Sequence, residues 1–337
     1  GGKAGDDPAR RYLETVRSQL EWLARHKINY TLVGAVPGNA DERVEMLRRV
    51  ADLAARYGIR LRRTFGTAID DELAPGAWTG CVTRGASRFC WSAAEEHGRR
   101  ARRLAREAAA TRLGLFCLHV IDAGGLADPE CWSRRCARCR SVYGDDYVRA
   151  GADLILTYYR ALKEEAPECE FEAVVYPYHY QWALPGFASG DAGFDARLPG
   201  EGFAAGLSSP GARRDARARL ERDFQALAAL LPEDVLITFR EAGRAELDAA
   251  GALWGEHPVT AWVYFSRNHG WQGLWEPQQR YLKTWHRGHP RDFFLHAGLA
   301  YAGNLVEPRA AGCAEYAWNP DVPDAEATFG VQHRFYR

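Results

Sequence analysis

The sequence lacks both net charge and long apolar runs. Its 44 Lys and Arg residues balance 44 Asp and Glu residues. The basic residues share their predicted helices with acids, so no face is marked for binding phosphate, and we expect no nucleic-acid partner. No apolar run approaches the roughly 20 residues that are needed to cross a bilayer, so we expect no membrane span.

Two signatures of cofactor chemistry are also missing. No Gly-rich phosphate loop follows any predicted strand, which argues against a nucleotide-binding doubly wound sheet. His119, His179 and His269 lie near predicted strand ends, but no HxH or HExxH spacing supports a catalytic zinc ion. We therefore expect that catalysis requires no cofactor, and a metal-dependent hydrolase is the least favoured hypothesis.

The N-terminal residues do not indicate a cellular location. The first residues are Gly1, Gly2 and Lys3, with neither an initiator methionine nor a signal peptide. We interpret this as a processed or trimmed chain, and both a cytoplasmic and an exported location stay open.

The chain does contain a regular alternation of apolar strands and amphipathic helices. Helix 41–57 is expected to end at Gly58, and Ser92 is expected to cap the helix that reaches Thr111. The predicted strands are 30–36, 59–65, 115–121, 171–178, 234–239, 259–265 and 294–301, and the predicted helices are 8–26, 41–57, 92–111, 145–166, 212–231 and 244–254.

This alternation predicts parallel βαβ units in an α/β protein. Seven strands and a leading helix favour a (β/α)8 TIM barrel whose first strand lies upstream or among the first residues. The alternative is a doubly wound open sheet. A length of 337 residues suits one barrel with insertions. We therefore expect a single domain over 1–337, with a Cys-rich loop at 123–143 and a Gly/Pro-rich insertion at 183–210.

The stretch from Leu115 to Tyr143 is the most informative part of the chain. Its first seven residues form a short apolar run that is typical of a buried parallel strand. The run stops at Asp122, shortly before two glycines. In an α/β barrel the loops after the strands carry the chemistry, so Asp122 is predicted to lie on the functional rim.

Aromatic and polar residues gather at the other predicted strand ends. Together they would form a cleft with flat apolar faces and polar edges, which suits sugars. The alternative is that aromatics are barrel core, and we favour core for Phe171, Trp262 and Val263. The remaining strand-end residues are Tyr176, Tyr178, His179, Tyr180, Trp182, Arg240, Glu241, Tyr264, Asn268, His269 and Trp271.

Three of the eight cysteines lie close together in the Cys-rich loop. Cys131, Cys136 and Cys139 have the spacing C-x4-C-x2-C. They could hold a structural zinc ion if a further ligand came from Cys90, Cys81 or a histidine. A local disulfide and uncoordinated thiols are the alternatives.

Two segments carry a resemblance to known families. The closing segment, HAGLAYAGNLVEPRAAGCAEYAWNPDVPDAEATF, resembles the end of the catalytic barrel in the O-GlcNAcase and bacterial hyaluronidase-like N-acetylhexosaminidases. There an Asn-containing last strand precedes a helix ending Tyr-x-Trp-Asn-Pro. The centre, IDAGG with the Cys-rich loop and YGDDYVRAGADLILTYYRALKE, is similar to barrel domains grouped with hexosaminidases and α-glucuronidases. Together these cover residues 22–329 and imply a carbohydrate-active barrel with an oligosaccharide or glycoconjugate as partner.

The resemblance also implies a site. In those hexosaminidases two adjacent carboxylates follow the fourth strand: one orients the substrate acetamido group and the next is the general acid. Here Asp122 matches the first, and Ala123 replaces the second. Either another carboxylate, for which Glu241 is the candidate, protonates the leaving group, or the barrel binds a glycan without cleaving it. The predicted substrate-binding residues are Tyr176, Tyr178, His179, Trp182, Arg240, Tyr264, Asn268, His269 and Trp271.

Overall fold

The structure is a computed structural model. It describes residues 7–26, 28–33, 36, 38–66, 81–82, 88–119, 135–174, 210–240, 254–263 and 294–295, with short stretches between 314 and 333. The predicted insertion at 183–210 and the predicted helix at 244–254 fall almost entirely outside these residues.

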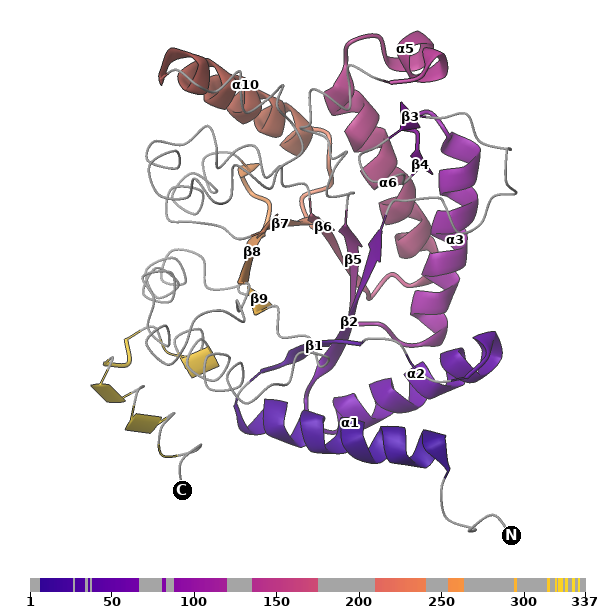
Figure 1. The fold of residues 1–337 in the computed structure, drawn as a ribbon, viewed down its shortest axis with the longest axis vertical. Coiled ribbons are helices and arrows are strands. Elements are labelled where there is room, and N and C mark those ends of the chain that lie inside the picture. The colour runs from indigo at the N-terminus through magenta and orange to yellow at the C-terminus, as the bar shows by residue number, and fades with distance from the viewer. Residues whose placement is uncertain are drawn as a thin grey trace.

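Seven parallel strands form one sheet in strict chain order (Figure 1). They are β1 (Tyr30–Leu32), β2 (Arg60–Gly66), β5 (Leu115–His119), β6 (Glu170–Val174), β7 (Leu236–Arg240), β8 (Val259–Val263) and β9 (Phe294–Leu295). All seven predicted strands are thus present, and the fold is α/β. A doubly wound sheet reverses its strand order at a switch point. The order of the described strands shows no reversal, so that alternative is wrong.

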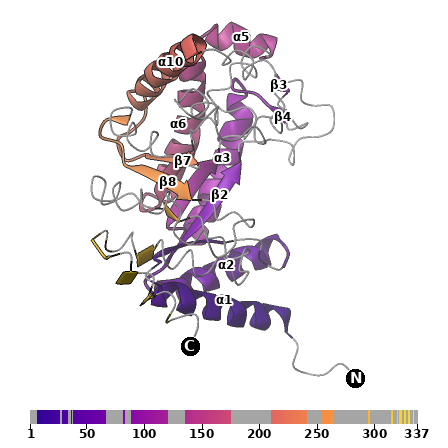
Figure 2. The same cartoon turned by 60° about the vertical axis from the view of Figure 1, so that its left-hand side comes forward.

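The sheet curves in Figure 1, and the long helices lie on its convex side. Figure 2 shows α1 and α2 together at one end of the molecule and α3 beside α6. No helix among the described residues is long and apolar enough to span a membrane. The helices are α1 (Pro8–Arg25), α2 (Ala40–Ala55), α3 (Ala94–Ala110), α5 (Ala137–Tyr143), α6 (Tyr147–Glu165) and α10 (Pro210–Ala228).

Local signals explain where these helices begin and end. Asn39 caps α2 in a capping box, because its side chain accepts from the Glu42 N–H while the Glu42 carboxylate accepts from the Asn39 N–H. After α2, Gly58 adopts φ +69°, a conformation that glycine adopts without strain, and this confirms the predicted stop. The predicted cap of α3 is wrong: its N-cap is Ala93, without a side-chain hydrogen bond.

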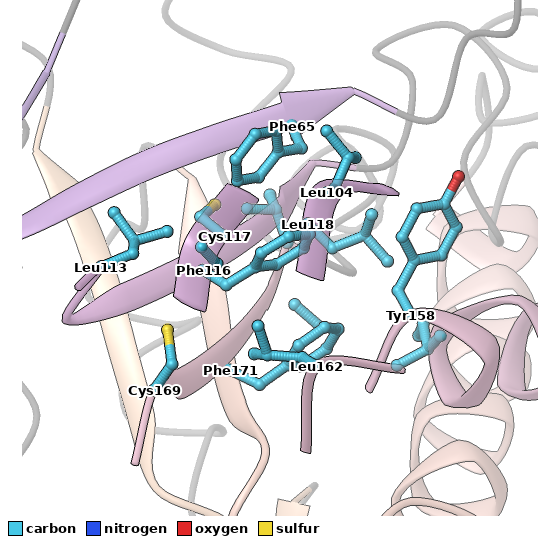
Figure 3. Packing of buried hydrophobic residues seen from close by; sticks show 14 of the residues in the cluster. Phe65, Leu104, Leu113, Phe116, Cys117, Leu118, Tyr158, Leu162, Cys169 and Phe171 are labelled. Carbon is cyan, nitrogen blue, oxygen red and sulfur yellow. The ribbon is translucent and has the colours of Figure 1, made fainter. Parts of the chain in front are cut away.

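The convex face of the sheet is apolar and packs against the helices (Figure 3). Phe65 of β2 stacks on Phe116 of β5 with ring centroids 4.4 Å apart. Phe116 in turn stacks on Phe171 of β6 at 5.7 Å. Leu104 of α3 and Leu162 of α6 belong to the same buried cluster. Phe171 is therefore core, as predicted, and each such ring contributes roughly 1.5–3 kcal/mol through burial.

The concave face, which we call the inner face, carries a buried ion pair. The Nε and Nη2 atoms of Arg62 donate to the two carboxylate oxygens of Glu172 at 2.7 and 2.8 Å. Thr238 of β7 donates to the same carboxylate at 2.6 Å, and Arg62 Nη2 lies 3.1 Å from the sulfur of Cys117. The side chains of Arg62 and Glu172 are only 4% and 0% exposed. The described helices lie on the opposite face, so they do not account for this burial.

A second polar group lies at the amino end of the same strands. Arg60 donates to Glu170 at 2.6 Å, and the Tyr30 hydroxyl donates to the other Glu170 oxygen at 3.0 Å. Arg60 also donates to the Gly114 carbonyl at 2.9 Å. A Cβ at Gly114 would lie 2.7 Å from the Arg60 Cβ, so this close approach requires glycine. Unlike the Arg62 pair, the Arg60 and Glu170 side chains are 43% and 41% exposed.

The two ion pairs predict different costs of substitution. We expect Glu172→Gln to lower the free energy of unfolding by about 3–5 kcal/mol, because it leaves a buried guanidinium without its counterion. The matched control Glu170→Gln removes a half-exposed partner and should cost less than about 1 kcal/mol. Guanidinium unfolding followed by circular dichroism measures both, and equal losses would contradict the contrast.

Candidate functional site

The carboxyl ends of the seven parallel strands lie on one edge of the sheet. In α/β folds this edge carries the binding and catalytic loops. Predicted site residues follow within three residues of the printed ends of four described strands. β5 ends at His119, three residues before Asp122; β6 ends at Val174, two before Tyr176; β7 ends at Arg240, next to Glu241; and β8 ends at Val263, next to Tyr264.

Of the predicted rim site, the structure describes only Arg240. It is the last residue of β7, where it pairs with Trp262 of β8. The other predicted catalytic and substrate-binding residues lie outside the described residues: Asp122, Glu241, Tyr176, Tyr178, His179, Trp182, Tyr264, Asn268, His269 and Trp271. Their roles stay predictions.

The strand register allows the sequence positions of the two candidate carboxylates, Asp122 and Glu241, to be compared. Cys117 of β5 pairs with Glu172 of β6, and Glu172 pairs with Leu236 of β7, so the three residues share one level of the sheet. Asp122 comes five residues after Cys117, and Glu241 comes five residues after Leu236. The two acids therefore hold equivalent sequence positions relative to this level.

A short hairpin precedes α3. It consists of β3 (Cys81–Val82) and β4 (Arg88–Phe89), in which Cys81 pairs with Phe89, the neighbour of Cys90. Sequence reasoning missed this hairpin, because two-residue strands in a Gly- and Thr-rich loop leave no alternating pattern to detect.

Three thiols converge beside this hairpin. The Cys90 sulfur lies 3.7 Å from that of Cys136 and 3.4 Å from that of Cys139, and all three lie within 4.8 Å of one another. A disulfide bond is about 2.05 Å long, so no disulfide joins them. Cys90 belongs to the segment after β2, and the other two belong to the segment after β5. Cys131, the third predicted member, lies outside the described residues.

The surroundings of the three thiols are polar and largely buried. Cys136 is the N-cap of α5, and its sulfur accepts from the Cys139 N–H at 3.5 Å. The end of the predicted Cys-rich loop is therefore helical. Ser92 Oγ lies 3.2 Å from the Cys90 sulfur and 3.3 Å from that of Cys139. Ser92, predicted as a helix cap, contacts the thiols instead.

His97 holds the backbone behind Cys90. Its Nε2 lies 3.0 Å from the Cys90 carbonyl, which can only accept, so Nε2 carries the proton. Burial lowers the pKa of His97 to about 4, which makes the ring neutral at neutral pH. Its Nδ1 therefore accepts from the Tyr158 hydroxyl at 3.2 Å. With both nitrogens engaged, His97 is not available as a metal ligand.

Two other cysteines are buried away from this cluster. Burial raises the pKa of Cys169 to about 12 and that of Cys117 well above its ordinary value. The thiolate is the nucleophile, so such thiols are inert.

We expect iodoacetamide at pH 8 to leave Cys117 and Cys169 unmodified in the native protein and to modify both after unfolding. For Cys169, a rise in pKa from 9.0 to about 12 lowers the thiolate fraction roughly 1,000-fold at this pH. Peptide mass spectrometry measures the rates, and equal rates in both states would contradict the prediction.

Comparison with known proteins supports the architecture. No sequence model of a protein family matches the chain, and no curated protein matches its sequence. Among solved structures, the chain is similar to a mutant of the O-GlcNAc hydrolase from Thermobaculum terrenum, with a TM-score of 0.58 and 10% identity. The match covers 96% of this chain, which spans 60% of that protein chain. At this identity the similarity shows a shared fold alone, that of a glycoside hydrolase.

Proposed function

We propose that the chain is a closed (β/α) barrel that hydrolyses glycosidic bonds in an N-acetylhexosaminide or a related glycan, with Asp122 and Glu241 as its carboxylates. One observation carries the proposal. In the register of β5, β6 and β7, Cys117 and Leu236 share one level of the sheet, and each acid comes five residues later in the sequence. They also follow the strand ends at which α/β folds place their chemistry.

Burial of the inner face supports closure of the sheet. Glu172 and Thr238 are both 0% exposed, although the helices pack on the convex side. In an open, singly wound sheet, the face without helices would meet solvent. A barrel buries this face in its own interior and makes 1–337 a single domain. The structural similarity to a glycoside hydrolase over 96% of the chain agrees with this.

The spacing of the strands suits two cooperating carboxylates. β5 and β7 are separated by one strand, β6. Two strand spacings of about 4.8 Å place their backbones roughly 10 Å apart. From that separation, two side chains that lean toward each other can flank a glycosidic bond.

The two acids take different roles. Asp122, which matches the acetamido-orienting carboxylate of the hexosaminidases, would remain ionised and stabilise the developing charge. Glu241 would protonate the leaving group and must therefore carry its proton when substrate binds. Partial burial among aromatic rings, or closeness to the Asp122 charge, favours the protonated form.

The remaining rim residues would bind the sugar. Indole rings stack on the apolar faces of sugars, while hydroxyl, amide and imidazole groups bind their hydroxyls. In this proposal the stacking residues are Trp182 and Trp271, and the hydrogen-bonding residues are Tyr176, Tyr178, His179, Arg240, Tyr264, Asn268 and His269.

A second candidate function rests on Ala123. The resemblance places a general acid at this position, and alanine cannot transfer a proton. If Glu241 does not replace that acid, the same rim would bind a glycan without cleaving it.

The proposal predicts the kinetics of two variants. On a panel of aryl N-acetylhexosaminides and uronides, Asp122→Asn and Glu241→Gln should each lower kcat/KM by about 100-fold or more while sugar binding persists, because each removes a catalytic charge or proton and not a contact. Glu170→Gln is the matched control: it changes a carboxylate at the opposite end of β6 and should keep kcat/KM.

Two results would contradict the proposed glycoside hydrolysis. Full activity in Glu241→Gln would remove Glu241 as the general acid. No turnover by the wild type, together with calorimetric binding of a glycan that is lost in Trp182→Ala and Trp271→Ala, would establish the glycan-binding function instead.

A further inference from the structure

We propose that Cys90, Cys136 and Cys139 bind a zinc ion together with a fourth thiolate, supplied by Cys81 or Cys131. The ion would join the segment that follows β2 to the segment that follows β5. This site is separate from the proposed sugar cleft, and the proposal does not depend on whether the chain hydrolyses glycans.

The three described sulfurs have the spacing that a tetrahedral zinc ion requires. With Zn–S bonds of about 2.3 Å, tetrahedral geometry places each pair of sulfurs about 3.8 Å apart. The observed separations from Cys90 are 3.7 Å to Cys136 and 3.4 Å to Cys139, and the whole group lies within 4.8 Å. Small side-chain rotations therefore suffice to admit an ion.

Polar groups surround the three sulfurs. The Cys139 N–H donates to the Cys136 sulfur, and the Ser92 hydroxyl is within reach of the Cys90 and Cys139 sulfurs. His97 anchors the Cys90 carbonyl, in the way that outer groups orient metal ligands.

Two cysteines can supply the fourth ligand. Cys81 pairs across the β3–β4 hairpin with Phe89, the residue before Cys90. Cys131 precedes Cys136 by five residues. In both arrangements each coordinating thiol releases one proton to solvent and no electron is transferred.

The geometry favours one ion over an iron–sulfur cluster. The spacing of Cys131, Cys136 and Cys139 also occurs in plant-type [2Fe–2S] proteins. In that cluster the four thiolates are divided in pairs between two irons, so three of them do not converge on a single point. Here three sulfurs from two segments do converge.

The site would be structural. Cys90 and Cys139 are 4% and 0% exposed, and four protein ligands leave no open position for substrate. The ion would cross-link positions 90 and 136, which are 46 residues apart, at the carboxyl ends of β2 and β5.

Metal content of the purified full-length chain tests the proposal. We expect about one zinc ion per chain by mass spectrometry of the elements, and a melting temperature that falls by at least about 5 °C when a chelator removes it. Cys90→Ser, Cys136→Ser and Cys139→Ser should each lose most of the zinc. Cys169→Ser is the matched control at a buried thiol near the opposite edge of the sheet, and it should retain the zinc.

Cobalt substitution of the wild type keeps the test decisive if a variant fails to fold. Tetrahedral thiolate coordination should give a sulfur-to-cobalt charge-transfer band and intense visible bands. Of Cys81→Ser and Cys131→Ser, one should release zinc to a competing chelator at least about 10-fold more readily. The four-thiolate site is overturned by unaltered retention in both variants, by bound iron in place of zinc, by a disulfide among these cysteines, or by rapid alkylation of all three thiols in the native protein.

Discussion

The salt bridge between Arg62 and Glu172 is the constraint on which the sheet depends. Taking both charges out of water costs several kcal/mol for each ion, and the bonds to Glu172 from Arg62 and Thr238 must offset it. The guanidinium reaches from β2 across β5 to β6, and the small side chain of Cys117 leaves room for it. A slip of one residue in any of these strands would turn a partner to the apolar face. The pair therefore fixes the register in which Cys117, Glu172 and Leu236 share one level of the sheet.

The alternation of elements could be predicted from the sequence because each signal is local. Apolar runs such as 115–121 and stops such as Gly58 depend on neighbours in the chain. The inner ion pair could not be predicted in this way, because Arg62 and Glu172 are 110 residues apart and only the pairing of β2, β5 and β6 brings them together.

The cysteine cluster could be predicted from the sequence only in part. The spacing of Cys131, Cys136 and Cys139 predicted a zinc site, a local disulfide or uncoordinated thiols, and Cys90 was one of several candidates for a further zinc ligand. Among the described elements, the packing of α3 against α6 and the hairpin before α3 bring Cys90 to Cys136 and Cys139. Ser92 was read as a cap because serine often begins helices. Its contact with the Cys139 sulfur depends on a segment 47 residues away.

The strict strand order has a consequence for biosynthesis. Each strand pairs with the one made before it, so the sheet can grow from its first strand as the chain leaves the ribosome. Cys90 emerges well ahead of Cys136 and Cys139. Its sulfur can approach theirs only after β5 has docked on β2 and α5 has formed. A newly made chain therefore passes through a stage in which the Cys90 thiol is open to oxidation. In the proposed zinc site, an ion that binds as soon as Cys136 and Cys139 arrive would end this stage.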